Sequence, residues 1–276
     1  MRIDAHQHCW DYSAVEYPWI GPGMERLARD YLPSDLDPLL AAEGIDGSVV
    51  VQARQSLEES RWLLGLADDH PIVKGVVGWV DLRREQVAHD LHELAAHPRF
   101  VGVRHVVQDE PDPRFVLGDA FVRGVRQLHQ HGLTYDLLLY PPQLPAAIEL
   151  VGLVPDQPFV VDHLAKPRIA AGDRGDWERD IRAIARHANV WCKVSGMVTE
   201  AARRGWKRSD FAPYLDVVFE AFTPRRLMFG SDWPVCLLAA EYADVVAIVR
   251  DYAEQLSADE QAMIWGGTAA TFYGLT

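Results

Sequence analysis

Short apolar runs alternate along this chain with longer segments in which apolar residues recur every three or four positions. Short runs rich in β-branched residues predict buried strands, and the three-to-four-residue recurrence predicts helices that bury one face. Eight strands are expected, over residues 2–5, 48–52, 73–80, 100–105, 134–140, 159–163, 190–193 and 227–232.

Helices are predicted between these strands. Ser34 and Asp119 carry side-chain oxygens that suit the N-cap position, and each precedes a segment of helical periodicity. The predicted helices cover residues 34–43, 57–69, 86–96, 119–128, 145–154, 177–184, 211–222, 242–256 and 257–273.

This alternation predicts a parallel sheet that is covered by helices on its outside, because the strands are apolar almost throughout. Eight strand–helix units within 276 residues fit one domain, residues 1–276, with the fold of a TIM (β/α)₈ barrel. A doubly wound open sheet is the competing fold. It is disfavoured because no glycine-rich phosphate-binding turn follows the first strand.

The charge of the chain excludes some partners. A formal charge of −13 and a pI near 5.2 argue against nucleic acid and against an anionic membrane surface. A neutral substrate, or one that gives an anionic product, suits such a protein better. Three cysteines far apart in the sequence indicate a reducing compartment, and no apolar run approaches 18 residues, so a cytoplasmic location is expected. The sequence leaves open whether the chain forms a homo-oligomer.

Polar residues recur where the predicted strands end, which is where barrel enzymes of this kind carry their active sites. Side chains alternate along a strand, so the imidazoles of His6 and His8 should point the same way. For Gln52, Tyr140 and Lys193, a satisfied polar residue at a strand end is as good an interpretation as function. The full set of such residues is His6, His8, Gln52, Arg104, His105, Tyr140, His163, Lys193 and Asp232.

The motifs at three strand ends resemble those of the amidohydrolase superfamily, and more narrowly its sugar-lactonase branch. The block around Asp232 is the most specific part, and the likeness to the L-fuconolactonases extends from about residue 1 to 273. The motifs are His6-Gln-His8, Asp162-His163-x-x-Lys166-Pro167 and Leu227-Met-Phe-Gly-Ser-Asp232-Trp-Pro-Val-Cys236.

The resemblance implies a distorted barrel that hydrolyses a small-molecule sugar lactone, with Asp232 activating water. Superfamily members with two metals use a carboxylated lysine or a glutamate at strand four and a histidine at strand five. Here strand four ends in Arg104-His105 and strand five lacks histidine, so a binuclear centre is not expected. One divalent ion, such as zinc, on His6, His8 and Asp232 stays an open alternative. Related lactonases work without metal, so no cofactor is strictly required.

Lactone hydrolysis needs a base for water and donors aimed at the developing oxyanion. Asp232 is the only carboxylate among the strand-end residues and is therefore the predicted base. The alternatives are a single-zinc decarboxylase of an unsaturated or aromatic acid, and a non-catalytic protein that binds sugar acids. The predicted carbonyl-polarising residues are His6, His8 and His163, and the predicted substrate-binding residues are Arg104, His105, Gln52 and Trp233.

Overall fold

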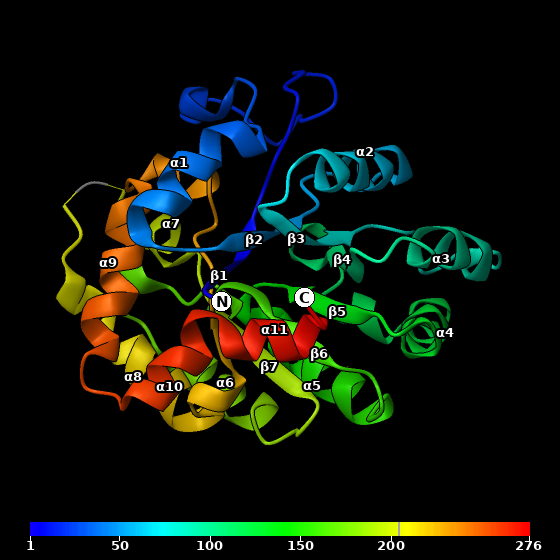
Figure 1. Ribbon diagram of the computed structural model, residues 1–276. Helices are drawn as coiled ribbons and strands as arrows, with labels where there is room; N and C mark the ends of the chain where they lie inside the picture. Colours follow the sequence, from blue (N-terminus) through cyan, green and yellow to red (C-terminus); the bar gives the residue numbers. More distant parts are fainter. Residues whose placement is uncertain (204) are drawn as a thin grey trace.

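The computed structural model describes residues 1–203 and 205–276 and shows the predicted barrel (Figure 1). All eight strands are parallel and pair in sequence order from β1 to β8. The strands are β1 (Ile3–Gln7), β2 (Gly47–Val51), β3 (Val73–Gly78), β4 (Phe100–Val106), β5 (Thr134–Leu138), β6 (Phe159–Val161), β7 (Val190–Val194) and β8 (Leu227–Phe229).

Five strands, β2, β3, β5, β6 and β8, end earlier than predicted, and the last two of these differences concern the site. We expected strand six to reach His163 and strand eight to reach Asp232, but β6 ends at Val161 and β8 at Phe229. Both His163 and Asp232 have positive φ angles, of 55° and 58°. A residue in the left-handed region cannot continue a β-strand, so the chain turns where the site residues begin.

The barrel closes between β1 and the segment that follows β8. The backbone N–H of Asp232 donates to the carbonyl of His6 at 2.8 Å, and that of His8 donates to the carbonyl of Trp233 at 2.7 Å. The buried carboxylate of Asp4 strengthens this seam by accepting from the N–H of Ser231 at 2.9 Å. Barrel closure therefore places Asp232 against the His-x-His segment.

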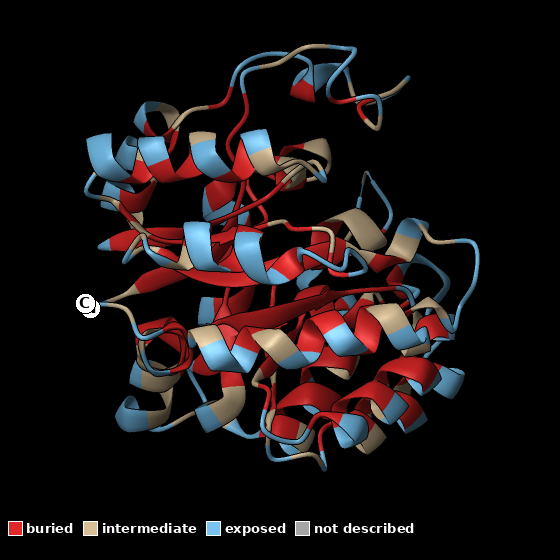
Figure 2. Cartoon of the chain, turned by 90° about the vertical axis from the view of Figure 1, so that its right-hand side faces the viewer, coloured by how far each residue is buried: buried red, intermediate tan, exposed pale blue. Residues whose placement is uncertain are grey.

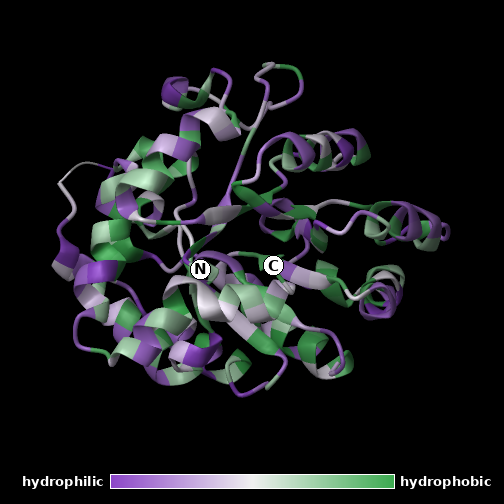
Figure 3. Cartoon of the chain, viewed as in Figure 1, coloured by the Kyte–Doolittle hydropathy of each residue, from purple (hydrophilic) through white to green (hydrophobic). Residues whose placement is uncertain are grey.

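Helices surround the barrel and present polar faces to solvent, while their inner faces and the strands are buried (Figures 2 and 3). The helices are α1 (Pro33–Glu43), α2 (Leu57–Asp69), α3 (Val87–Ala95), α4 (Asp119–Leu128), α5 (Leu144–Leu153), α6 (Gly175–Ile184), α7 (Met197–Glu200), α8 (Ala212–Phe222), α9 (Tyr242–Ala253), α10 (Ala258–Ala262) and α11 (Thr268–Tyr273).

Both predicted N-caps are wrong. Helix α1 begins at Pro33, whose missing N–H costs nothing at that position, and the carboxylate of Asp35 accepts from the N–H of Leu32 at 2.9 Å. Asp119 is the first residue of α4 and caps no backbone N–H with its side chain. The negative charge of Asp119 instead interacts favourably with the positive amino-terminal end of the helix dipole.

Helix α11 closes the amino-terminal end of the barrel. In Figure 1 it lies, in red, across the strands beside both chain termini. Phe272 and Tyr273 join a buried cluster with Ala5 and Val49 from the barrel interior. The Tyr273 hydroxyl donates to the Asp136 carboxylate, at 3.0 and 3.1 Å from its two oxygens. Within the described residues, no helix is long and apolar enough to span a bilayer.

Candidate active site

A cavity of about 860 Å³ opens at the carboxyl ends of the strands. His8, Arg104, His163 and Asp232 line its inner part, and residues of the strand–helix loops form its walls. A cavity of this size accommodates a small organic ligand. The predicted position of the site is therefore also the position of a substrate-sized cavity.

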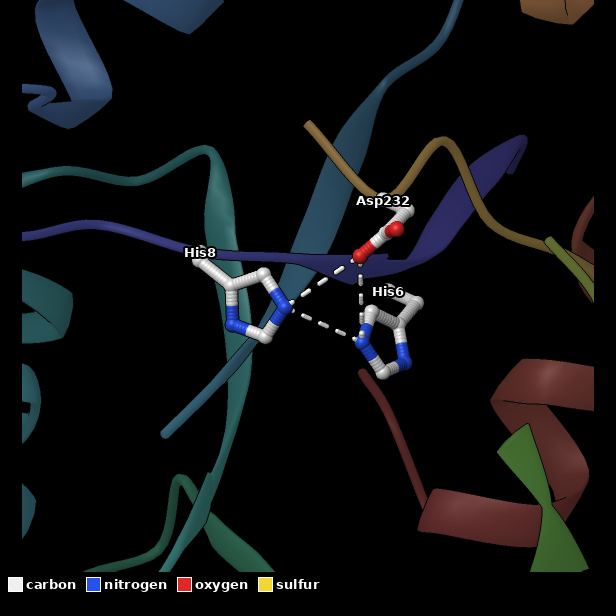
Figure 4. A group of neighbouring side chains, drawn as sticks. All are labelled: His6, His8 and Asp232. Atoms are coloured by element: carbon white, nitrogen blue, oxygen red, sulfur yellow. Dashed lines mark hydrogen bonds and ion pairs between the residues drawn. The ribbon is translucent and has the colours of Figure 1, made fainter. Parts of the chain in front are cut away.

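His6, His8 and Asp232 converge on one point at the inner end of this cavity (Figure 4). Nε2 of His6 lies 3.2 Å from Nε2 of His8. Oδ1 of Asp232 lies 3.4 Å from Nε2 of His8 and 3.8 Å from Nε2 of His6. All three side chains are buried, so their interactions are only weakly screened by water.

His163 joins this group from an unusual turn. Its Nε2 lies 3.8 Å from Oδ1 of Asp232, and its Nδ1 is 2.9 Å from the hydroxyl of Ser195. Residues 163–166 all have φ between 50° and 56°, although none is glycine. Each such residue costs roughly 1–2 kcal/mol relative to the right-handed form. The surrounding fold therefore stabilises a strained turn that carries His163 into the site.

Gly196 makes room for the His163 ring. A Cβ atom at position 196 would lie 2.4 Å from Nδ1 of His163, and the φ of Gly196 is +60°. Both the close approach and the left-handed backbone require glycine here. Gly230 plays a similar role against His6, because a Cβ there would lie 2.7 Å from the Cβ of His6.

The hydrogen-bond partner of Nδ1 determines the tautomer of His8. Nδ1 of His8 lies 2.8 Å from the carbonyl oxygen of Val51, which can only accept a hydrogen bond. Nδ1 therefore carries the proton, and in the neutral ring Nε2 presents a lone pair to Oδ1 of Asp232. Two acceptors that face each other at 3.4 Å need a proton donor or a cation between them.

A buried charge network lies beneath the histidines. The Lys193 ammonium contacts the carboxylates of Asp136 and Asp162 and lies 3.0 Å from Nδ1 of His6. Nη1 of Arg104 lies 3.1 Å from Oδ2 of Asp162 and 3.3 Å from Nε2 of His6. Two cations thus balance two carboxylates in the barrel interior. This balance is what permits four charges to be buried together.

The environment keeps Asp232 ionised. Burial alone would raise the pKa of Asp232, but the neighbouring histidines, His163 foremost, outweigh it and lower the pKa below its usual value. Burial lowers the pKa of His163 to about 4 and also lowers that of His8. Near neutral pH the site therefore contains a carboxylate among neutral imidazoles, which suits a base that accepts a proton from water.

The His6–His8–Asp232 group fits one divalent cation. Nitrogen and oxygen ligands about 2.0–2.1 Å from a tetrahedral zinc ion lie roughly 3.4 Å apart. The three donor atoms here are separated by 3.2, 3.4 and 3.8 Å. The lone pair of His8 that faces Asp232 also has the chemistry of a metal ligand. These three residues could therefore hold the ion that the sequence left as an alternative.

Three predicted substrate-binding residues do not line the cavity. Nε2 of His105 lies 2.7 Å from Glu110, and its ring stacks on Phe115 outside the barrel. Gln52 is fully buried, with Nε2 directed to the carbonyl of Arg104. Trp233 packs edge-on against Tyr31. Of the four predicted substrate-binding residues, only Arg104 reaches the cavity. Its neighbour His105 points to the opposite face of β4, because side chains alternate along a strand.

Other residues that the sequence left unassigned do line the cavity. Lys166, Tyr140 and Glu200 form part of its wall. Lys166 could be suspected from its motif and Tyr140 from its place after strand five. Glu200 lies in the short helix α7, and no sequence pattern marked it.

Comparison with known proteins adds an independent finding. Residues 3–275 match the family model described as amidohydrolase. An L-fucono-1,5-lactonase from Burkholderia multivorans is 46% identical over all of this chain and 96% of its own length. A second L-fucono-1,5-lactonase, from Burkholderia ambifaria, is 37% identical over 99% of this chain and 95% of its own length. A crystal structure of an amidohydrolase from Burkholderia multivorans with bound zinc has 45% identity and a TM-score of 0.96, covering 100% of both chains.

Proposed function

The chain belongs to the amidohydrolase family, and from this premise we propose that it is a lactonase that opens a sugar-acid lactone, such as L-fucono-1,5-lactone, to the aldonate. The observation that carries the proposal is the ionised Asp232 carboxylate beside three imidazoles at the inner end of a substrate-sized cavity. Relatives at 46% and 37% identity that are L-fucono-1,5-lactonases support the same chemistry.

In the proposed reaction Asp232 accepts a proton from water as the water oxygen bonds to the lactone carbonyl carbon. The lone pair on Nε2 of His8 can hold the second hydrogen of the same water. A base placed in this way contributes roughly 10²- to 10⁴-fold in rate.

The carbonyl oxygen becomes an oxyanion and needs donors that are already in place. The guanidinium of Arg104 and the imidazoles of His6 and His163 surround the same point and are the proposed donors. When the intermediate collapses, the bond between the carbonyl carbon and the ring oxygen breaks, and Asp232 returns its proton to that oxygen. The new carboxylic acid then ionises, so each turnover releases one proton.

A zinc ion on His6, His8 and Asp232, if bound, would supply Lewis acidity toward the carbonyl oxygen. The residues described above act on water and on the oxyanion through their own protons and charges. We therefore propose that no cofactor is strictly required.

The decarboxylase alternative has less support from this site. It expects a histidine at strand five, whereas the inward residue of β5 is Asp136, which bonds to Lys193 and Tyr273. A non-catalytic binder would have no use for an ionised base at the inner end of its cavity. The assay on lactones separates the lactonase from this binding protein.

The test is a proton-release assay on aldonolactones with five- and six-membered rings, using the unaltered enzyme and Asp232→Asn. We expect turnover of at least one lactone and a kcat about 10²-fold or more lower in the variant. The variant keeps the size of the side chain and removes its negative charge. Absence of turnover across the panel would favour a binding protein, and an unchanged rate in Asp232→Asn would remove Asp232 as the base.

A further inference from the structure

The left-handed turn that carries His163 into the cavity also carries Lys166 into it. Residues 163–165 belong to a 3₁₀-type turn, which has three residues per turn, so positions 163 and 166 lie on the same side. Both side chains line the cavity. Leu164 and Ala165, between them, are fully buried, and the indole of Trp177 donates to the carbonyl of Leu164 at 2.7 Å. The turn is therefore held in place by packing on its other side.

Lys166 faces Glu200 across a gap. Nζ of Lys166 lies 4.0 Å from Oε1 of Glu200, which is longer than a hydrogen bond, and the two side chains are 17% and 21% exposed. Nζ also lies 5.3 Å from the centre of the Tyr140 ring, within range of a cation–π contact. Burial raises the pKa of Glu200, with the charge of Lys166 opposing it. The two side chains are thus partly desolvated, and no direct hydrogen bond joins them.

We propose that Lys166 and Glu200 together recognise a ring hydroxyl of the lactone, which bridges the two charged groups. This inference rests on the proposed function and names the substrate feature that the cavity selects. A hydroxyl oxygen about 2.8 Å from both Nζ and Oε1 would make an angle of about 90° between them, which is compatible with accepting one hydrogen bond and donating the other. A charged donor and a charged acceptor make both bonds stronger than neutral ones.

The other charges of the cavity agree with an uncharged, hydroxylated ligand. Arg54 is paired with Glu16 at 2.9 Å, and Arg104 with Asp162 at 3.1 Å. Among the described lining residues, Arg203 is the cation without a carboxylate within 4 Å, and it lies at the exposed rim. A lactone that carries its own carboxylate would meet acids as often as bases. The cavity therefore favours hydroxyl groups over anionic substituents.

The test compares two lactones with the same ring. L-Fucono-1,5-lactone carries ring hydroxyls, and δ-valerolactone carries none. We expect Lys166→Met and Glu200→Gln each to lower kcat/KM for the hydroxylated lactone by about 10- to 100-fold. The same variants should leave δ-valerolactone, followed as a slow substrate or as a competitive inhibitor, within about twofold of the unaltered enzyme.

The double variant, Lys166→Met with Glu200→Gln, shows whether both side chains contact the same hydroxyl or act independently. If one hydroxyl bridges both groups, the double variant should lose about as much as the larger single loss, because the two losses are not additive. Glu149→Gln, which breaks an exposed ion pair with Arg114 away from the cavity, is the matched control and should change neither substrate.

Each other outcome overturns the inference. An equal loss on both lactones would mean that the pair acts on the ring or on the reacting atoms and not on a hydroxyl. Unchanged kcat/KM for the hydroxylated lactone would mean that the pair does not contact substrate. Absence of turnover by the unaltered enzyme on every lactone would overturn the proposed function as well, so the two failures are distinguishable.

Discussion

The ammonium nitrogen of Lys193 lies 3.0 Å from Nδ1 of His6, on the opposite edge of the imidazole from the nitrogen that faces Asp232. Lys193 is completely buried and also contacts the carboxylates of Asp136 and Asp162. One cation therefore stabilises two buried carboxylates and supports the ring of a site histidine.

Replacing Lys193 by methionine should destabilise the fold. Lys193→Met keeps most of the side-chain volume but leaves Asp136 and Asp162 with one cation fewer, and breaking a buried ion pair in this way costs about 3–5 kcal/mol. Burial already raises the pKa of Asp136 to about 6 even with Lys193 present. Denaturant unfolding at pH 7 would measure the loss.

Two further variants check the cause. Asp136→Asn combined with Lys193→Met should recover part of the stability, because it removes one of the uncompensated charges. Arg114→Met, in an exposed ion pair, should change the free energy of unfolding little. A loss below about 1 kcal/mol in Lys193→Met would show that the network does not depend on this cation.

The barrel and the position of its site could be predicted from the sequence because both follow from local patterns. Short apolar runs, seven of them rich in β-branched residues, marked all eight strands, and the period of two placed His6 and His8 on one face. The same period also implies that Arg104 and His105 point to opposite faces of β4, and the structure shows Arg104 in the cavity and His105 outside the barrel.

Other features of the site could not be predicted because they depend on tertiary contacts. Nothing in the residues His163 to Lys166 indicates a left-handed turn, since none of them is glycine and each alone prefers the right-handed region. The partnership of Asp136 with Lys193 is equally hidden: the two residues are 57 positions apart and meet only when the barrel closes around them.

Gly196→Ala should lower activity by displacing His163. The added Cβ would lie 2.4 Å from Nδ1 of His163, and a shift of about 1 Å in a catalytic group can cost roughly 10²-fold in rate. We expect kcat/KM to fall by about that factor in the lactone assay.

Gly132→Ala is the matched control for backbone strain. Gly132 has a φ of +69°, close to the +60° of Gly196, but no atom lies within 4 Å of the place that an alanine Cβ would take there. Both variants should lose similar stability from the left-handed alanine, and Gly132→Ala should keep its full kcat/KM. Equal activities in the two variants would contradict a role for Gly196 in seating His163.

The pH profile should be flat from about pH 8 to 5 and fall only in more acid solution. A base acts in its ionised form, so its contribution is present above its pKa and lost as the pH falls through it. The pKa of Asp232 is lowered below its usual value, and that of His163 is lowered to about 4. The base Asp232 and the imidazole of His163 should therefore keep their charge states between pH 8 and 5.

Initial rates of lactone opening, corrected for spontaneous hydrolysis at each pH, would measure this profile. An acid limb with a midpoint near 6.5 would mean that a histidine of ordinary pKa must stay neutral for activity. That result would contradict the buried, neutral histidines that surround Asp232.

Removal of divalent metal should leave lactone hydrolysis intact. Arg104 and Lys193 already place two positive charges within 3.3 Å of the ring nitrogens of His6. Arg104, together with the imidazoles of His6 and His163, can stabilise the oxyanion without a Lewis acid. We expect kcat/KM after dialysis against a chelator, with the metal content checked by mass spectrometry, to match that of the untreated enzyme.

Zinc binding itself can be measured apart from activity. Calorimetric titration with zinc should show one site, because His6, His8 and Asp232 offer three converging ligand atoms. His8→Ala should weaken this binding by at least about 100-fold, whereas His129→Ala, at an exposed turn, should not change it. If activity disappears on chelation and returns with zinc, and His8→Ala loses both together, the ion is essential and the metal-free reaction proposed for Asp232 is wrong.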